Sequence, residues 1–254
     1  MRQSLLVAVL MAAGGLLGST CGLAGAPGPP TKARVLVLTG NEYPGHHWKE
    51  TAPLLARFLA GDRRLATEVQ ADPNFLASPR LHDYDVLVLN YMNWESPDPG
   101  PAARANLQKF VAEGKGLVLV HFACGAFQGW PEFKEIAGRV YNPKLRPHDP
   151  YGKFTVEIAA PDHPITKGLS SFETTDELYT CLDGDRSIQV VATARSKIDG
   201  EDFPMAFVNA YGKGRVFHCV LGHDTAALSV KGVQDLYRRG TAWAAGLPAT
   251  GDGR

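Results

Sequence analysis

Cysteine is scarce in this chain of 254 residues: there are four, and no two of them form a CxxC pair. Structural zinc ribbons are built from such pairs, so that class of site is excluded. Cys124, Cys181 and Cys219 are widely spaced and odd in number, so they do not make the disulfide framework of a small secreted domain. Cys219 lies in the apolar run 216–221, where a buried, unreactive thiol is expected.

An excess of charge is also absent, because 26 Lys and Arg residues balance 26 Asp and Glu residues. No segment concentrates basic residues, so a nucleic-acid partner, whose binding depends on counterion release, is not expected. The chain has no P-loop and no HExxH motif, which removes the commonest phosphate-binding and zinc-protease signatures. With 44% hydrophobic residues the chain is too apolar to be disordered. Small molecules or protein surfaces are the expected partners.

Long apolar runs are missing except near the N-terminus. Residues 5–13 are apolar, follow Arg2 and precede a stretch of small residues, which is the pattern of a secretory signal peptide. The run is too short for a membrane-spanning helix, so no transmembrane segment is expected. We assign 1–26 to the signal peptide and the start of a linker, and 27–33 to the linker, and we predict a secreted or periplasmic protein. A lipid anchor at Cys21 is the minority alternative, because the usual leucine before it is missing.

Short apolar strands alternate with helices in the first half of the rest of the chain. The predicted strands there are 34–39, 65–70, 85–90 and 116–120, and the predicted helices are 48–59 and 102–113. Strands that are apolar on both faces indicate a mostly parallel sheet with helices on both sides. The second half is strand-rich, at 154–159, 175–182, 188–192, 205–209 and 214–221, and ends in a helix near 230–244. We predict one α/β domain over 34–247, with antiparallel strands added in its C-terminal half, and a disordered tail over 248–254.

Ligands of such sheets bind beyond the carboxyl ends of the strands, so the residues that follow each strand are the first candidates for a site. These positions are rich in polar and aromatic side chains, and they hold four of the eight histidines. The polar and aromatic candidates found there, the four histidines included, are His46, His47, Asn90, Tyr91, Trp94, His121, His223 and Asp224. A convergence of titratable groups in such a crevice predicts an active site there.

The chain also resembles a known family at these positions. The matching segments are 45–47, 81–88, 110–121, 162–169, 176–179, 211–217 and 221–224. On these residues, which extend essentially from Arg34 to Gly246, the sequence is similar to the ThuA-like family, named for trehalose utilisation. The resemblance implies a flavodoxin-like fold of the class I glutamine amidotransferase-like superfamily. It also implies a part in carbohydrate catabolism, particularly of glycosides oxidised at the 3-position.

Glutaminase activity is not expected, although the superfamily is named for it. That chemistry needs a cysteine on the tight turn after a strand, with small neighbours and a histidine base. His121 occupies the position directly after the strand, and Cys124 follows three residues later, with Phe122 crowding the turn. A Cys124–His223 amidase is therefore the least favoured of the functions considered, and we expect Cys124 to be a buried hydrophobic residue.

His121 and His223 are the main catalytic candidates, because an imidazole titrates near neutral pH and suits general acid or base work. Each follows a predicted strand, so both are expected in one crevice. Adjacent residues rarely face one another, so the carboxylate that orients an imidazole is expected from elsewhere than Asp224. The resemblance places Asp176 and Glu177 near the pocket, and we take these two as the orienting candidates.

A divalent metal such as Zn²⁺ is a further candidate, because it binds neutral imidazole and carboxylate together. His47, His121 and His223 are the expected ligands, with His46 as the alternative to His47 and with Glu177 as a carboxylate. One histidine of the 46–47 pair is expected to face the crevice and the other to face solvent or cap the helix. No compact ligand motif is present, so the prediction rests on residue types alone.

The expected substrate is a sugar. Aromatic rings cover the C–H face of a pyranose while polar side chains bind its hydroxyl groups. The expected substrate-binding residues are His46, His47, Asn90, Tyr91, Trp94, Phe122, Tyr179 and Asp224. The favoured function is an exported carbohydrate-active enzyme of the hydrolase, lyase or isomerase type, acting on a sugar or a 3-keto-glycoside. The rival is a non-catalytic carbohydrate-binding or accessory module.

Overall fold

The computed structural model describes residues 32–94 and 96–251. The predicted signal peptide and most of the predicted linker lie outside these residues. From Lys32 onward the chain forms one compact unit. None of the helices in this described part combines the length and the apolar character needed to cross a membrane.

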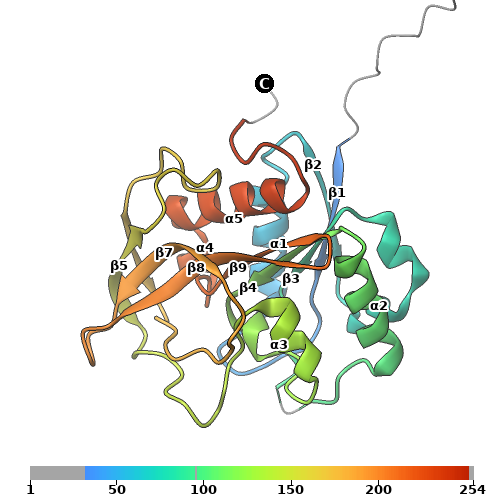
Figure 1. Ribbon diagram of the computed structural model, residues 1–254, viewed down its shortest axis with the longest axis horizontal. Coiled ribbons are helices and arrows are strands. Elements are labelled where there is room, and N and C mark those ends of the chain that lie inside the picture. Colours follow the sequence, from blue (N-terminus) through green and yellow to red (C-terminus); the bar gives the residue numbers. More distant parts are fainter. Residues whose placement is uncertain (1–31, 95, 252–254) are drawn as a thin grey trace, which may run out of the picture. The chain divides into compact units, whose positions relative to one another are not determined.

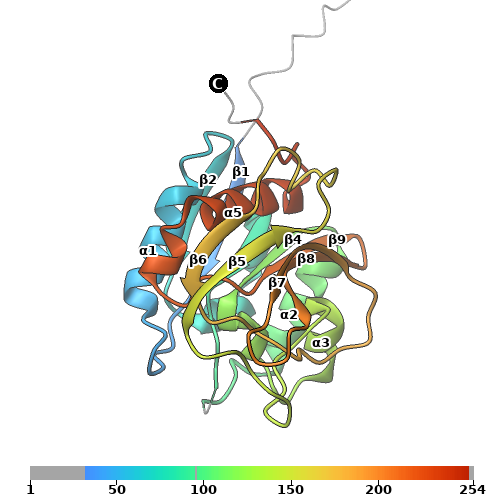
Figure 2. The ribbon, with the colours of Figure 1, turned by 90° about the vertical axis from the view of Figure 1, so that its left-hand side faces the viewer.

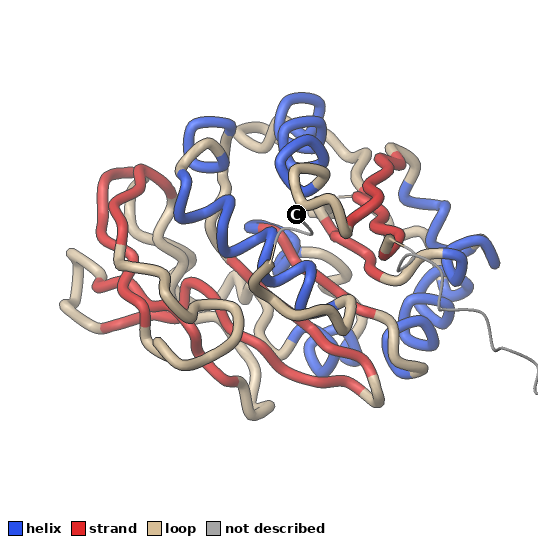
Figure 3. Tube along the Cα trace, turned by 90° about the horizontal axis from the view of Figure 1, so that it is seen from above, coloured by secondary structure: helices blue, strands red, loops and turns tan. Residues whose placement is uncertain are grey.

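A single nine-stranded sheet organises the molecule, with its strands in the order β2-β1-β3-β4-β9-β8-β7-β5-β6. The strands are β1 (Ala33–Leu38), β2 (Leu65–Gln70), β3 (Val86–Leu89), β4 (Gly116–Val120), β5 (Gly152–Ile158), β6 (Phe172–Asp176), β7 (Gln189–Arg195), β8 (Asp202–Tyr211) and β9 (Gly214–Cys219). The first five in spatial order are parallel, and the other four extend the sheet in antiparallel fashion. Figure 3 shows this extension at the side of the sheet away from β1 and β2. The predicted fold class is confirmed.

Helices cover both faces of the parallel half (Figures 1 and 2). They are α1 (Trp48–Leu59), α2 (Pro101–Ala112), α3 (Pro131–Ala137), α4 (Thr225–Leu228) and α5 (Lys231–Ala244), with the short 3₁₀ helices η1 (Pro73–Ala77), η2 (Pro79–Asp83) and η3 (His121–Gly125). Side chains alternate across β1, so Val37 joins the core under α1 and α5, while Leu36 and Leu38 join the core under α2 and α3. All three are fully buried, which is why this strand reads as a continuous apolar run.

One predicted strand differs from the structure in a way that affects the site. The sequence predicts a strand over 175–182, but β6 ends at Asp176. The Asp176 side chain accepts a hydrogen bond from the backbone N–H of Glu177 at 2.8 Å, which turns the chain away from the sheet. Residues from Glu177 onward therefore form a loop that returns over the strand ends.

The end of the chain also differs from expectation at residues 248–251, which the sequence assigns to a disordered tail. Ala249 is buried, and the carbonyl oxygen of Pro248 accepts a hydrogen bond from Nη1 of Arg64 at 2.8 Å. The packed part of the chain thus extends past residue 247, because these contacts hold its last described residues against the body of the domain.

Candidate active site at the carboxyl ends of the strands

Three imidazoles and one carboxylate meet where β1, β4 and β9 end. His46 comes from the loop after β1, His121 from the start of η3 after β4, Glu177 from the loop after β6, and His223 from the loop after β9. Nε2 of His46 lies 3.2 Å from Nε2 of His121, and Oε2 of Glu177 lies 3.4 Å from that same His121 nitrogen. Oε2 of Glu177 also lies 3.2 Å from Nδ1 of His223. We call these four residues the His–Glu centre.

His121 is held at this position by its backbone and by its ring. Its φ of 48° is in the left-handed region, which a residue with a side chain adopts only when its surroundings impose it, often at functional sites. Nδ1 of the imidazole donates a hydrogen bond to the carbonyl oxygen of Val220 at 2.9 Å. In a neutral ring the other nitrogen, Nε2, then carries a lone pair, and it faces His46 and Glu177.

Glu177 contacts two of the three imidazoles of the centre. Burial favours its protonated form, but its contacts with His121 and His223 and their charge outweigh burial and hold the pKa of Glu177 well below its usual range. The reverse applies to His223: burial opposes its charged form, but contact with the Glu177 carboxylate and its negative charge raise the pKa of His223. The carboxylate is therefore ionised, and it favours a positive charge among the imidazoles.

Asp176 acts on the backbone and not on an imidazole. Its buried carboxylate accepts hydrogen bonds from the N–H groups of Gly222 at 2.6 Å, His223 at 3.1 Å and Glu177 at 2.8 Å. Burial raises its pKa despite these bonds. This one side chain thus joins the two loops that carry His223 and Glu177, so its role is to position them.

The structure separates the adjacent histidines of the first loop. His46 lies within the aromatic cluster, with its ring 4.9 Å from Phe122 and 4.8 Å from His223. Burial, followed by repulsion from His121 and His223, lowers the pKa of His46 to about 3, so its ring is neutral. His47 is exposed at the N-cap of α1 and is not among the residues whose ligand-type atoms lie close together. Of the two adjacent histidines, His46 is thus the one that faces the other imidazoles, because the first turn of α1 begins at that point and directs the next residue outward.

Asp224, a predicted substrate-binding residue, makes structural contacts next to the centre. It is the N-cap of α4, where its Oδ1 accepts a hydrogen bond from the N–H of Ala227 at 2.8 Å. Its Oδ2 accepts a hydrogen bond from the hydroxyl of Tyr151 at 2.8 Å. The ring of Tyr151 in turn lies 5.5 Å from that of His223. Asp224 thus anchors a helix and an exposed tyrosine beside the centre.

The aromatic candidates divide into two groups. Tyr179 packs edge-on against His121 at 5.0 Å, and Trp94 lies 6.0 Å from Phe122. Both therefore belong to the ring cluster around the His–Glu centre. Tyr91 is buried and packs against Phe127, with ring centroids 5.9 Å apart, so it is a core residue at the margin of the site.

A small cavity of about 30 Å³ lies beside the imidazoles. It is lined by Asn41, His46, Trp48, Thr51, Asn90, Tyr91, Met92, Val120, His121, Phe122, Ala123 and His223. Nδ1 of His46 and Nε1 of Trp48 are buried without a hydrogen-bond partner among the described residues. Asn90 donates to the hydroxyl of Thr51 at 3.2 Å. The cavity is large enough for a water molecule or a hydroxyl group, and its walls offer polar atoms to bind one.

The imidazoles near Glu177 differ in their exposure to solvent. The exposed fraction of the side chain is 3% for His121, 17% for His223 and 31% for His148. Nε2 of His148 lies 3.6 Å from Oε1 of Glu177. His148 and His223 are therefore the more accessible imidazoles beside this carboxylate. Sequence reasoning assigned no role to His148, because its Pro-rich loop showed no sign that it pairs with Tyr179 by an isolated bridge.

A family model described as "ThuA: Trehalose utilisation" matches residues 34–244. The chain belongs to the ThuA family. The structural comparisons agree in fold. A protein described as ThuA-like from Parabacteroides merdae ATCC 43184 is 24% identical, with a TM-score of 0.77, and the match covers 87% of this chain and 93% of that one. A second such protein, from Bacteroides uniformis ATCC 8492, is 20% identical, with a TM-score of 0.68, and the match covers 88% of this chain and 94% of that one. Among curated proteins, none matches this chain.

The ThuA chain also shares its fold with a protein from Thermoplasma acidophilum that is described as part of a GMP synthase. The identity is 15% and the TM-score 0.54, and the match covers 86% of this chain and 96% of that one. In the ThuA chain Cys124 is fully buried, and burial raises the pKa of its thiol far above the ordinary value. A thiolate nucleophile needs the opposite environment. Cys124 is thus a core residue behind the site.

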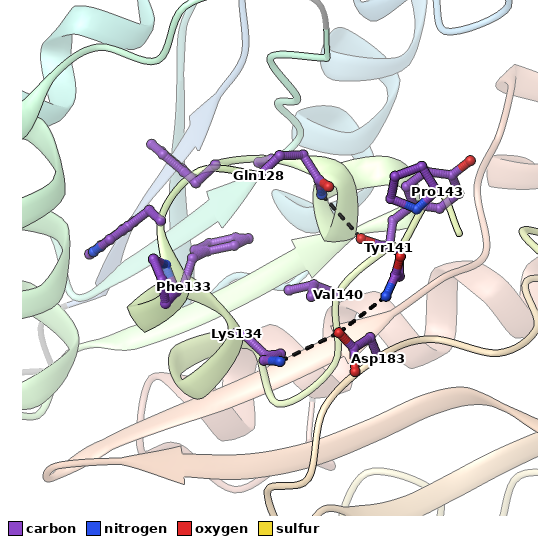
Figure 4. A pocket seen from close by; sticks show the side chains of 12 residues that line it. Gln128, Phe133, Lys134, Val140, Tyr141, Pro143 and Asp183 are labelled. Carbon is purple, nitrogen blue, oxygen red and sulfur yellow. Dashed lines mark hydrogen bonds and ion pairs between the residues drawn. The ribbon is translucent and has the colours of Figure 1, made fainter. Parts of the chain in front are cut away.

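A larger pocket of the ThuA chain lies beside Tyr141 (Figure 4). Its volume is about 290 Å³, and its walls include Phe133, Tyr141 and Gln128 together with the ion pair of Lys134 and Asp183. The ring of Tyr141 lies 5.5 Å from that of Phe122, which in turn contacts His46. The rings of Tyr141 and Phe122 therefore connect this pocket to the His–Glu centre.

Proposed function

We propose that this ThuA-family protein is an enzyme of carbohydrate catabolism that transfers protons on a sugar, with a 3-keto-glycoside as the favoured substrate. The observation that supports this most is the His–Glu centre itself. Three histidines come together from separate segments of the chain, and two of them contact one ionised carboxylate, an arrangement suited to acid–base work. The family's link with trehalose utilisation supports a sugar as the substrate.

The chemistry follows from the acidity of a carbon next to a ketone. In a 3-keto-glycoside, a base takes the proton from C2, the electron pair forms a C1=C2 double bond, and the C1–O bond breaks. An acid then supplies a proton to the leaving oxygen. The His121–His223 pair provides a base and an acid within one site, and Glu177 holds both rings. Addition of water across the double bond would complete a hydrolysis.

The neighbouring rings suit the rest of such a substrate. The cavity of about 30 Å³ beside His46 accommodates a hydroxyl or keto oxygen, whereas a whole sugar ring needs more room. In this proposal the reacting ring lies over Phe122 and Trp94, and the second ring of a disaccharide reaches the pocket of about 290 Å³ beside Tyr141.

The test is turnover of a panel of 3-keto-disaccharides and their unoxidised parents by the wild-type chain and by His121→Ala. We expect the substitution to lower kcat by a factor of about 10² to 10⁴, because it removes one proton-transfer group. A matched control is His163→Ala, since His163 packs against Trp243 away from the site. Circular dichroism checks that each variant folds. Turnover of a 3-keto-glycoside that is unchanged in His121→Ala would refute the assignment.

The rival function, a non-catalytic carbohydrate-binding module, is favoured by one observation: the larger pocket adjoins the aromatic cluster and not the imidazoles. It predicts sugar binding that survives His121→Ala and is lost in Trp94→Ala. Calorimetric titration of both variants with the same disaccharides, in the absence of any turnover by the wild type, would identify this function.

A further inference from the structure

The donor atoms of the His–Glu centre point at one another. The ligating atoms of His46, His121, Glu177 and His223 all lie within 4.8 Å of one another. Because Nδ1 of His121 donates to the carbonyl oxygen of Val220, its Nε2 presents a lone pair to the centre when the ring is neutral. Nε2 of His121 lies 3.4 Å from Oε2 of Glu177. Imidazole nitrogen and carboxylate oxygen are both ligands that a divalent transition-metal ion binds.

The spacing of these atoms suits a metal ion better than a single shared proton. Ligands about 2.0–2.1 Å from a tetrahedral ion lie about 3.4 Å from one another. Three separations in the centre are close to this value: 3.2 Å from His46 to His121, 3.4 Å from His121 to Glu177 and 3.2 Å from Glu177 to His223. Nδ1 of His223 is buried and has no hydrogen-bond partner of good geometry among the described residues, although Oε2 of Glu177 lies 3.2 Å away.

The surroundings have the features of a metal site. A ligating imidazole commonly donates its other N–H to a backbone carbonyl, as His121 does to Val220. The buried Asp176 fixes the loops of two of the four residues through their backbone N–H groups.

We propose that His46, His121, His223 and Glu177 bind one divalent transition-metal ion, with Zn²⁺ as the first candidate for this donor set. Binding of the ion stands apart from the sugar chemistry, but its part in turnover rests on the proposed function. There the ion would supply a positive charge beside the keto oxygen, which would make the C–H next to it more acidic. Imidazoles that bind the ion would not be free to transfer protons, so water in the site would take over those transfers.

The experiment measures metal content and metal affinity in the purified full chain. Mass spectrometry of the elements gives the ions bound per chain, and titration of chelator-treated protein with Zn²⁺ and Co²⁺ gives the affinities, with the visible bands of Co²⁺ reporting its ligands. The test variant is His46→Gln, which lies at the edge of the centre, and the matched control is the exposed neighbour His47→Gln. Thermal unfolding of each variant checks the fold.

We expect about one ion per chain in the wild type and in His47→Gln, and an affinity weaker by on the order of 100-fold or more in His46→Gln. Glu177→Gln, which keeps the size of the side chain, is expected to weaken binding as well. Absence of Zn²⁺ and Co²⁺ binding by the wild type, or equal binding by His46→Gln, would overturn the proposal. A chain that binds metal but turns over no sugar refutes the proposed function alone, and a chain that turns over sugar but binds neither Zn²⁺ nor Co²⁺ refutes the metal site alone.

Discussion

At the scale of single residues, the site depends on side chains held in unfavourable surroundings. His121 has a left-handed backbone, and Glu177 is an ionised carboxylate that burial alone would protonate. Each is kept in place by a neighbour: Val220 fixes the ring of His121, and the imidazoles hold the charge of Glu177. These features identify the centre as a place where folding maintains strain and charge, which is typical of functional sites.

A residue outside the site gives a pH-dependent prediction. His218 of β9 is fully buried against Phe207, with ring centroids 4.6 Å apart. Burial lowers its pKa from 6.5 to about 4. At a pH between these two values, His218 is therefore protonated in the unfolded chain and neutral in the folded chain. The stability that His218 contributes is therefore present above pH 6.5 and is lost as the pH falls.

We expect this group to lower the free energy of unfolding by about 2 kcal/mol between about pH 7 and about pH 5. Urea unfolding at a series of pH values measures the effect. His218→Leu is expected to show a shallower loss of stability over the same range. Parallel pH profiles for the two proteins would contradict the argument.

Residue types at the strand ends predict a site built from histidines, but they do not tell which of these residues belong to it. Adjacent positions 46 and 47 carry the same residue, and which of them faces inward depends on where the first turn of α1 begins. The sequence does not indicate His148 as a candidate because it lies in a Pro-rich loop, although that loop brings it to Glu177. Both outcomes depend on backbone direction, which residue type does not specify.

At the scale of elements, β6 shows why the boundaries of the second half were less predictable. Apolar alternation continues past Asp176, so the sequence extends the strand, but a side-chain hydrogen bond to the backbone ends it. The loop that results carries Glu177 to the imidazoles. An early end to this strand is thus a requirement of the site.

Close packing of α5 on β9 makes a second prediction. A Cβ atom added at Gly240 would lie 2.1 Å from the ring of Phe217, so the helix can approach the strand only with glycine there. Gly240→Ala is expected to destabilise the domain by about 1–3 kcal/mol, even though alanine is the better helix former. Thermal or urea unfolding measures the change.

The control for this prediction is Gly129→Ala, since a Cβ at Gly129 meets no atom within 4 Å. We expect that substitution to change the free energy of unfolding by no more than about 0.5 kcal/mol. An equal effect of the two substitutions would show that backbone freedom, and not the contact with Phe217, determines the result.

At the scale of the whole molecule, export remains a prediction from the N-terminal sequence. Expression of the full chain in a bacterium with a periplasm should yield a processed protein that begins after Ala24 or Ala26 and is recovered from the periplasm or the medium. Mass spectrometry of the intact protein gives its N-terminus. A chain that keeps Met1 and stays with the cytoplasmic fraction would refute the signal peptide, as would an unchanged location after deletion of residues 2–24.

The sequence by itself determined the architecture of this protein. Continuous apolar runs such as 35–38 and 117–120 can be buried only in a sheet covered on both faces, and the glycines and helices between them leave a parallel order. The sequence also indicated which edge of the sheet carries the polar groups, because the carboxyl ends of all parallel strands lie at the same edge.

Only the tertiary structure decided which of those groups meet. The residues of the His–Glu centre are separated by up to 177 positions along the chain. Their ligand-type atoms lie within 4.8 Å of one another because the four segments that carry them meet at one end of the sheet. The physical reason is that periodic apolar patterns encode burial, which is a local property, whereas the direction of a polar side chain depends on turns, caps and hydrogen bonds made with distant segments.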